Sequence, residues 1–144
     1  MYKCKYFKIY ELIDRFTYEK FGEEAWMFLN PLALISIDGV REFFTIKRGK
    51  DVPFTINNWQ GGGKFQFRGL RPIFYTAGAL YSQHRLGNGF DGDLKNISAE
   101  EARQEILANK DHELLKHITC IETNINWVHL DCRNISDRIR IVEP

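Results

Sequence analysis

Two histidines and one aspartate are spaced so that they could bind one metal ion. His84 and Asp91 lie seven residues apart, with two glycines between them, and His129 follows 45 residues after His84. A loop that bends at glycine can turn His84 and Asp91 toward one point. Two imidazoles and one carboxylate are a common catalytic zinc set, which leaves a position for a water whose pKa falls toward about 7. Each residue alone is more often an ordinary polar side chain, so only the combination favours a metal.

The wider pattern around these residues is similar to a known family. The first motif, Ser-x-His-x-x-Gly-x-small-x-Asp, is matched at Ser82, His84, Gly87 and Asp91, with Gly89 at the usual alanine position. The second motif, Trp-Val-His, is matched at 127–129. Together they resemble the zinc D-alanyl-D-alanine carboxypeptidase family, which includes phage L-alanyl-D-glutamate endolysins and is structurally related to the hedgehog signalling domain.

This resemblance implies a fold, a reaction and a set of site residues. The implied fold is α+β and hedgehog-like, with a small central antiparallel sheet flanked by helices. His84, Asp91 and His129 would hold zinc, and Arg71, which resembles an upstream arginine of the family, would bind the substrate anion. The implied reaction is zinc-dependent hydrolysis of an amide bond in a peptidoglycan stem peptide, of carboxypeptidase or endolysin type.

The sequence departs from the family pattern at the residue that would transfer a proton during the reaction. Many members have a glutamate three residues before the last ligand histidine, but this chain has Asn126, whose amide cannot transfer the proton. Glu122 is the nearest carboxylate, and strict strand alternation would place it on the face opposite His129 unless a turn or bulge intervenes at 123–126. Asp131 is the alternative, either as base or as a partner of His129. We favour Glu122 as the catalytic carboxylate.

Two other classes of function stay open. Asn126 also suits a non-catalytic zinc-containing binding or structural module of the same fold. Nucleic-acid binding would rest on residues 47–71, where six basic residues interleave with aromatic ones. The chain has 20 basic and 19 acidic side chains and no recognised binding motif, so we expect no nucleic-acid partner. In a cell-wall enzyme the same segment would suit an anionic stem peptide.

Length and composition indicate a single domain over residues 1–144. A chain of this length with 44% apolar residues can bury a core unaided, and its three cysteines lack C-x-x-C spacing. No stretch resembles a signal peptide or approaches about 18 apolar residues, so we expect no membrane partner and a cytoplasmic location. A monomer, encoded by a phage and released to the cell wall through a separate pore, would suit such an enzyme.

Other polar residues are poorer candidates for chemistry. His112 and His117 are five residues apart, which on a helix turns them about 140° from each other and away from a shared metal. Lys64 follows three glycines, but Phe65 stands where a phosphate-binding loop needs Ser or Thr. Asp93 could compete with Asp91, although the register of the family motif prefers Asp91.

Helices are expected mainly before the strands. Apolar spacing predicts a helix over 6–21. Asn30 with Pro31 begins a buried helix over 32–46 that is broken or bent near Gly39. A long surface loop should follow, and Ser98 with Glu101 should cap a helix that ends near 109. We predict antiparallel strands at 118–121, 125–132 and 138–142, joined by turns at Asn124 and 134–137.

Overall fold

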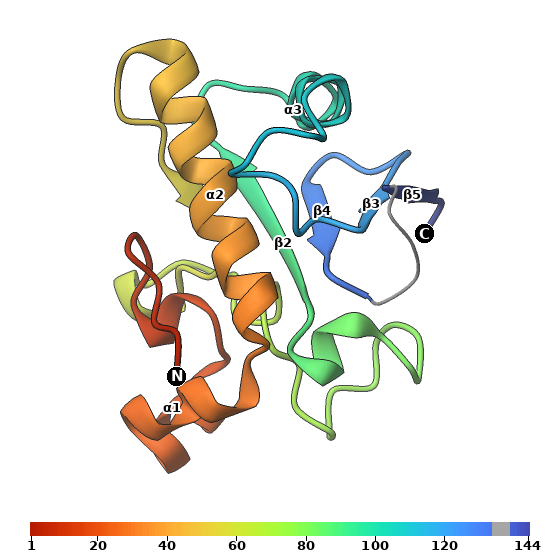
Figure 1. Cartoon of the computed structure of the whole chain (residues 1–144). Coiled ribbons are helices and arrows are strands. Elements are labelled where there is room, and N and C mark those ends of the chain that lie inside the picture. The colour runs from red at the N-terminus through yellow and green to blue at the C-terminus, as the bar shows by residue number, and fades with distance from the viewer. Residues whose placement is uncertain (134–138) are drawn as a thin grey trace.

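The computed structural model describes residues 1–133 and 139–144 and has an α+β architecture (Figure 1). The described residues form three α-helices and a five-stranded mixed sheet of order β1-β2-β4-β3-β5. The helices are α1 (Arg15–Phe21), α2 (Pro31–Arg48) and α3 (Ala99–Ala108). The strands are β1 (Phe54–Thr55), β2 (Gly89–Leu94), β3 (Cys120–Glu122), β4 (Val128–Asp131) and β5 (Arg140–Val142). Short 3-10 helices are η1 (Ile9–Glu11), η2 (Gly22–Phe28), η3 (Trp59–Gly61) and η4 (Gln83–Leu86).

The central helix α2 packs against β2, as Figure 1 shows. Its predicted start is confirmed: the Asn30 side chain accepts a hydrogen bond from the backbone N of Leu32, and Pro31 is the first helical residue. A break near Gly39 is ruled out, because α2 continues through this position as one helix. Gly39 instead permits close packing, since a Cβ there would lie 1.9 Å from the carbonyl oxygen of Leu114.

The predicted helix over 6–21 is wrong, because the structure has the two short helices η1 and α1. Between them, Asp14 caps α1 by accepting a hydrogen bond from the backbone N of Thr17. The carbonyl of Leu12 accepts a hydrogen bond from Leu70, and that of Ile13 accepts one from the Trp59 indole. A continuous helix would use these carbonyls internally, so bonds to the following loop replace helical ones.

The sheet has one apolar and one polar face. On the apolar face, Phe90 lies opposite Leu130, and Leu130 lies opposite Ile121. These residues join the buried core with side chains of α2 and α3. The opposite face carries Asp91 and His129, because successive strand residues alternate sides. The helices therefore cover one face of the sheet, and the opposite face carries the polar side chains of the candidate site.

The sheet is mixed, which corrects the antiparallel prediction. β2 and β3 occupy the two edges of β4, so β5 has no free edge of β4 with which to form a hairpin. β5 pairs instead with β3, and in parallel orientation. The predicted turn at 134–137 and the first residue of the predicted strand 138–142 lie outside the described residues.

The third helix begins as predicted, because the Ser98 side chain accepts a hydrogen bond from the backbone N of Glu101. Its buried Arg103 donates hydrogen bonds to the carbonyls of Ile125 and Trp127, in the connection between β3 and β4. Within the described part of the chain, no helix has the length and apolarity to cross a bilayer. The helix α3 thus fixes the turn that precedes the last candidate ligand.

The contact between α2 and the segment before β3 predicts a specific sensitivity at Gly39. We expect Gly39→Ala to lower the free energy of unfolding by about 2 kcal/mol or more. The overlap with the Leu114 carbonyl should outweigh the gain in helix propensity of about 1 kcal/mol. Urea denaturation measures this change. Gly61→Ala is the matched control, because its Cβ would meet no atom within 4 Å. Equal stability of the two variants would contradict this packing.

Candidate metal centre

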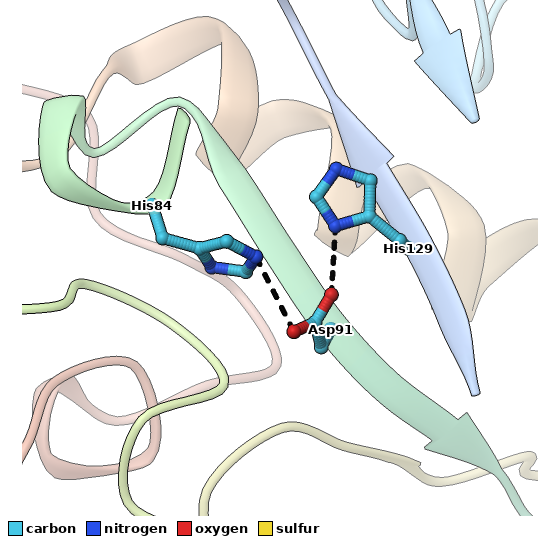
Figure 2. A group of neighbouring side chains, drawn as sticks. All are labelled: His84, Asp91 and His129. Carbon is cyan, nitrogen blue, oxygen red and sulfur yellow. Dashed lines mark hydrogen bonds and ion pairs between the residues drawn. The ribbon is translucent and has the colours of Figure 1, made fainter. Parts of the chain in front are cut away.

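Asp91 and His129 are direct cross-strand partners on the polar face of the sheet. The Nδ1 atom of His129 lies 2.7 Å from Oδ1 of Asp91 (Figure 2). The prediction that Asp91 lies in a glycine-bent loop is wrong, because it is in the middle of β2. The pairing of β2 with β4 therefore brings together two residues that are 38 positions apart.

His84 reaches the same point from η4, outside the sheet. Its Nε2 lies 3.3 Å from Oδ2 of Asp91, and its ring centroid lies 5.1 Å from that of His129. Gly87 ends η4 with a φ of +68°, and a Cβ there would lie 2.2 Å from the carbonyl oxygen of Phe28. Only glycine meets both conditions, so this residue lets the chain turn from His84 into β2.

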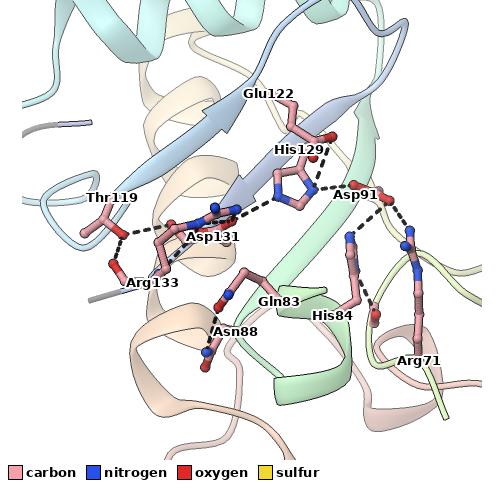
Figure 3. Close-up of polar contacts among 11 residues, drawn as sticks. Arg71, Gln83, His84, Asn88, Asp91, Thr119, Glu122, His129, Asp131 and Arg133 are labelled. Carbon is pink, nitrogen blue, oxygen red and sulfur yellow. Dashed lines mark hydrogen bonds and ion pairs between the residues drawn. The ribbon is translucent and has the colours of Figure 1, made fainter. Parts of the chain in front are cut away.

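In each imidazole, the ring nitrogen that faces away from Asp91, the outer nitrogen, lies next to a hydrogen-bond acceptor. Nδ1 of His84 lies 2.9 Å from the carbonyl oxygen of Gly69, which can only accept, so this nitrogen carries a proton. Nε2 of His129 lies 3.2 Å from Oδ2 of Asp131 in the same way (Figure 3). Partners of this kind orient the histidines of metal sites, and here they leave both inner nitrogens facing Asp91.

One potential ligand atom each from His84, Asp91 and His129 lies within 4.8 Å of the other two. All three residues are at most 5% exposed. This buried group could hold a metal ion, and its two nitrogens and one carboxylate are donors that suit zinc among other divalent metals. The structure thus brings together the three residues that the sequence proposed as ligands.

The electrostatics of the group favour a charged Asp91. Burial alone would raise the pKa of Asp91, but hydrogen bonds with His129 and His84 hold it well below its usual range. Burial also opposes the charge on His129, yet hydrogen bonds to Asp131 and Asp91 raise its pKa to about 9. Without a metal, a proton on His129 therefore supplies positive charge beside Asp91. A metal ion would take over this role and release the proton.

Arg71 contacts the centre directly. Its Nη2 donates to Oδ2 of Asp91 at 2.8 Å, and its Nε donates to the carbonyl of Phe67 at 2.8 Å. No described residue accepts a hydrogen bond from Nη1, which leaves that nitrogen available to a ligand. Arg71 also lines a cleft of about 510 Å³ beside His84, Asp91 and His129. The anion-binding role expected from the sequence stays a prediction, and the structure adds a direct contact between Arg71 and Asp91.

Glu122 lines the same cleft, with Oε2 4.0 Å from Nδ1 of His129. The two residues lie on neighbouring antiparallel strands, since Ile121 pairs with Leu130 and a turn connects β3 to β4. Because the turn separates them into two strands, Glu122 and His129 can lie on the same face of the sheet although they are an odd number of residues apart. Asn126 is exposed and lines a different pocket, together with Glu100 and Arg103 of α3. Glu122 therefore places a carboxylate in the cleft from a position other than that of the family motif.

Asp131 is fully buried and differs from Glu122 in its contacts. Besides His129, it accepts hydrogen bonds from the backbone N and the guanidinium of Arg133. Burial would raise its pKa, but His129 and Arg133 lower it overall. Because both oxygens of Asp131 are engaged, it acts as a partner that orients His129. The contacts of Gly69 and Arg133 were not predicted, because no sequence motif marks a backbone carbonyl that accepts a hydrogen bond or an arginine that follows a strand.

The residues that the sequence set aside lie apart from the centre. Nδ1 of His112 accepts a hydrogen bond from the backbone N of Leu114, and its ring packs against Phe43. Asp93 forms an ion pair with Arg68 at the surface. His117 lies in the turns before β3 and does not line the cleft.

Comparisons with known proteins do not assign the chain to a family. No protein-family model matches it, and neither the curated proteins nor the solved structures include a significant match. The geometry of the site and the motif resemblance are therefore the basis for any functional conclusion.

The contact between Asp131 and His129 predicts an effect on metal affinity. We expect Asp131→Asn to weaken zinc binding by about 10–100-fold, because the amide cannot fix the proton position and charge of His129 as a carboxylate does. Competition with a fluorescent chelator measures the affinity. Asp111→Asn is the control, since Asp111 is exposed and does not line the cleft. Unchanged affinity in a folded Asp131→Asn variant would remove Asp131 from the site.

The raised pKa of His129 predicts how stability depends on pH. Its folded value of about 9 exceeds the value of about 6.5 for an unfolded histidine, so protonation of His129 stabilises the fold. This stabilisation is fully present below about pH 6.5 and is lost as pH rises through about 9. In urea titrations with chelator present, the free energy of unfolding should fall across this window. His129→Gln should show a much smaller fall, and an identical pH profile would count against the charge arrangement.

Proposed function

We propose that this chain is a zinc-dependent amide hydrolase of the D-alanyl-D-alanine peptidase and hedgehog type, acting on peptidoglycan stem peptides. One observation carries the proposal. The inner nitrogens of His84 and His129 and the carboxylate of Asp91 face one another in a cleft that also contains the carboxylate of Glu122. The ligand types and their order along the chain agree with the motif resemblance.

Zinc held by His84, Asp91 and His129 would polarise a substrate carbonyl and lower the pKa of a water molecule toward about 7. The free Nη1 of Arg71 can donate to the carbonyl or carboxylate oxygen of the substrate. Glu122 can accept the proton of the water and deliver it to the leaving nitrogen. The amide C–N bond breaks, the hydroxyl of water ends on the carbonyl carbon, and its proton ends on the amine.

The position of Glu122 favours a hydrolase over a non-catalytic zinc module. A structural metal site is normally closed by four protein ligands, whereas three ligands beside an open cleft leave a position for water. Asn126 does not argue against catalysis, because it lines a separate pocket and Glu122 supplies a carboxylate near His129. A 4.0 Å distance to His129 is compatible with a proton carrier whose hydrogen bonds tighten when substrate binds.

The test uses the zinc-loaded chain and the stem pentapeptide L-Ala-γ-D-Glu-L-Lys-D-Ala-D-Ala, with products identified by mass spectrometry. We expect cleavage of one amide bond. Glu122→Gln should lower kcat by about 10²–10⁴-fold while zinc content stays at one per chain, because only proton transfer is removed. Asn126→Ala is the matched control and should keep both zinc and activity, since it lies outside the cleft.

Two results would overturn parts of the proposal. Zinc binding that is unchanged in both His84→Ala and His129→Ala would show that the metal centre is elsewhere. One zinc per chain without cleavage of the pentapeptide or of purified cell walls would favour the non-catalytic module. Normal activity of Glu122→Gln would keep the hydrolase but assign the proton carrier to another group.

A further inference from the structure

Large hydrophobic side chains gather on the surface beside the cleft. Five of the eleven exposed ones in the described part of the chain lie within 73–86, namely Ile73, Phe74, Leu80, Tyr81 and Leu86. Phe16 of α1 joins them, because its ring packs edge-on against that of Phe74 with 5.1 Å between the ring centroids. We call these six side chains the rim face. None of them belongs to the hydrophobic core, so folding does not account for them.

The rim face lies at one end of the molecule. In Figure 1, η4 and the loop before it occupy the same end as α1 and the beginning of α2, away from α3. A backbone hydrogen bond joins these segments, since the N of Asn30 donates to the carbonyl of Gly87 at the end of η4. Segments that are far apart in the sequence therefore present these side chains at the same end.

The loop that carries most of the rim face has a defined shape. The ring of Tyr75 packs on that of Phe67, and the carbonyl of Tyr75 accepts a hydrogen bond of 2.6 Å from the Arg85 guanidinium. The backbone N of Tyr75 also donates to the carbonyl of Pro72, which closes a turn. Ile73 lies within this turn and is 90% exposed. The contacts of Tyr75 thus hold the loop while Ile73 points into solvent.

The rim face borders the cleft of the candidate metal centre. Tyr81 is 85% exposed and lines that cleft. In η4, His84 is buried beside Asp91, whereas Leu86, two residues later, is 60% exposed. One short helix therefore presents a candidate ligand on its inner side and a hydrophobic side chain on its outer side. The rim face is fixed relative to the centre for this reason.

The charges around the rim face suit an anionic surface. The sequence has no aspartate or glutamate between Asp51 and Asp91. Within 71–86, Arg71 is already paired with Asp91, but Arg85 has no acidic partner among the described residues. Beside Phe16, Glu19 of α1 is paired with Arg15. The balanced total charge of the chain averages over this local difference, which leaves one available cation and no competing carboxylate in the loop.

The size and shape of the rim face favour a lipid surface over a second copy of the chain. A stable protein interface buries about 800 Å² on each partner and involves about 20–30 residues a side, and six side chains fall short of this. Ile73 and Tyr81 also stand almost free of neighbouring atoms, whereas the core of a protein interface is closely packed. Fluid acyl chains can close around such protruding side chains, and tyrosine is enriched at the bilayer interface.

We propose that the rim face docks onto the surface of an anionic lipid bilayer, with its hydrophobic side chains among the acyl chains and Arg85 at the headgroups. This inference goes beyond the proposed function and stands without it. The expectation of no membrane partner rested on the lack of a spanning segment, which surface docking does not need. A docked chain would hold the mouth of the cleft at the bilayer, because Tyr81 belongs to both.

The experiment measures binding of the full-length chain to vesicles by co-sedimentation. One set of vesicles contains phosphatidylcholine alone, and the other contains equal amounts of phosphatidylcholine and phosphatidylglycerol. We expect the anionic vesicles to bind the chain about fivefold more tightly at low salt, because Arg85 is attracted to their surface. This difference should shrink at high salt, which screens the attraction.

Substitutions connect the binding to the rim face. Ile73→Ser/Leu80→Ser should weaken binding to anionic vesicles by about 10–100-fold, because two large hydrophobic side chains no longer leave water. The matched control is Ile46→Ser/Ile141→Ser, which removes two exposed hydrophobic side chains outside the rim face and should retain binding. Arg85→Gln should lower the affinity for anionic vesicles about fivefold and leave that for phosphatidylcholine unchanged. Urea denaturation checks that each variant is folded.

The outcomes separate a lipid surface from the other occupants. No binding to anionic vesicles, or equal binding by the parent chain and a folded Ile73→Ser/Leu80→Ser variant, would overturn the proposal. A dimer that forms without lipid and is lost in this variant, together with no vesicle binding, would overturn it in favour of a second copy. Vesicle binding that depends on Ile73 and Leu80, in a chain that cleaves no stem peptide, would support the docking surface and reject only the hydrolase.

Discussion

Asp91 is a buried carboxylate between two imidazoles and a guanidinium, and such a charge is stable in a protein interior only when partners replace its lost hydration. The partners come from three separate parts of the chain: β4, η4 and the segment after Gly69. Each is fixed by its own backbone contacts, including the strand pairing of β2 with β4 and the hydrogen bond from Arg71 N to the His84 carbonyl. The same charge that requires these partners is what could attract a divalent cation.

The two-faced sheet explains how a small domain can hold such a group without losing its core. Alternation along β2 and β4 directs Phe90 and Leu130 toward the helices and Asp91 and His129 away from them. The helices then stabilise the strands from one side only. Arg103 adds a second connection, because it joins α3 to the turn between β3 and β4. The spacing between Glu122 and His129 thus depends on packing from the opposite layer.

Local signals in the sequence predicted local structure well. The caps of α2 and α3 follow from Asn30 and Ser98, whose side chains bond to nearby backbone. The three residues of the buried group that could hold a metal ion were selected from the sequence because they form motifs. β2 was missed, because Gly89, Gly92 and two aspartates are unfavourable in strands and its formation depends on pairing with β1 and β4. The break after η1 and the parallel β5 likewise depend on tertiary hydrogen bonds and on which strand edges are free.

Arg71 connects the wall of the cleft with the candidate metal centre. Its planar guanidinium directs Nε to the Phe67 carbonyl and Nη2 to Asp91, while Nη1 is left for a ligand. A lysine has one compact ammonium group and could not make these contacts in three fixed directions. Arg71 therefore joins the backbone of the segment 67–71 to the carboxylate of Asp91. Because Arg71 lines the cleft while it is bonded to Asp91, an anion that accepted a hydrogen bond from Nη1 would lie at a fixed distance from the centre.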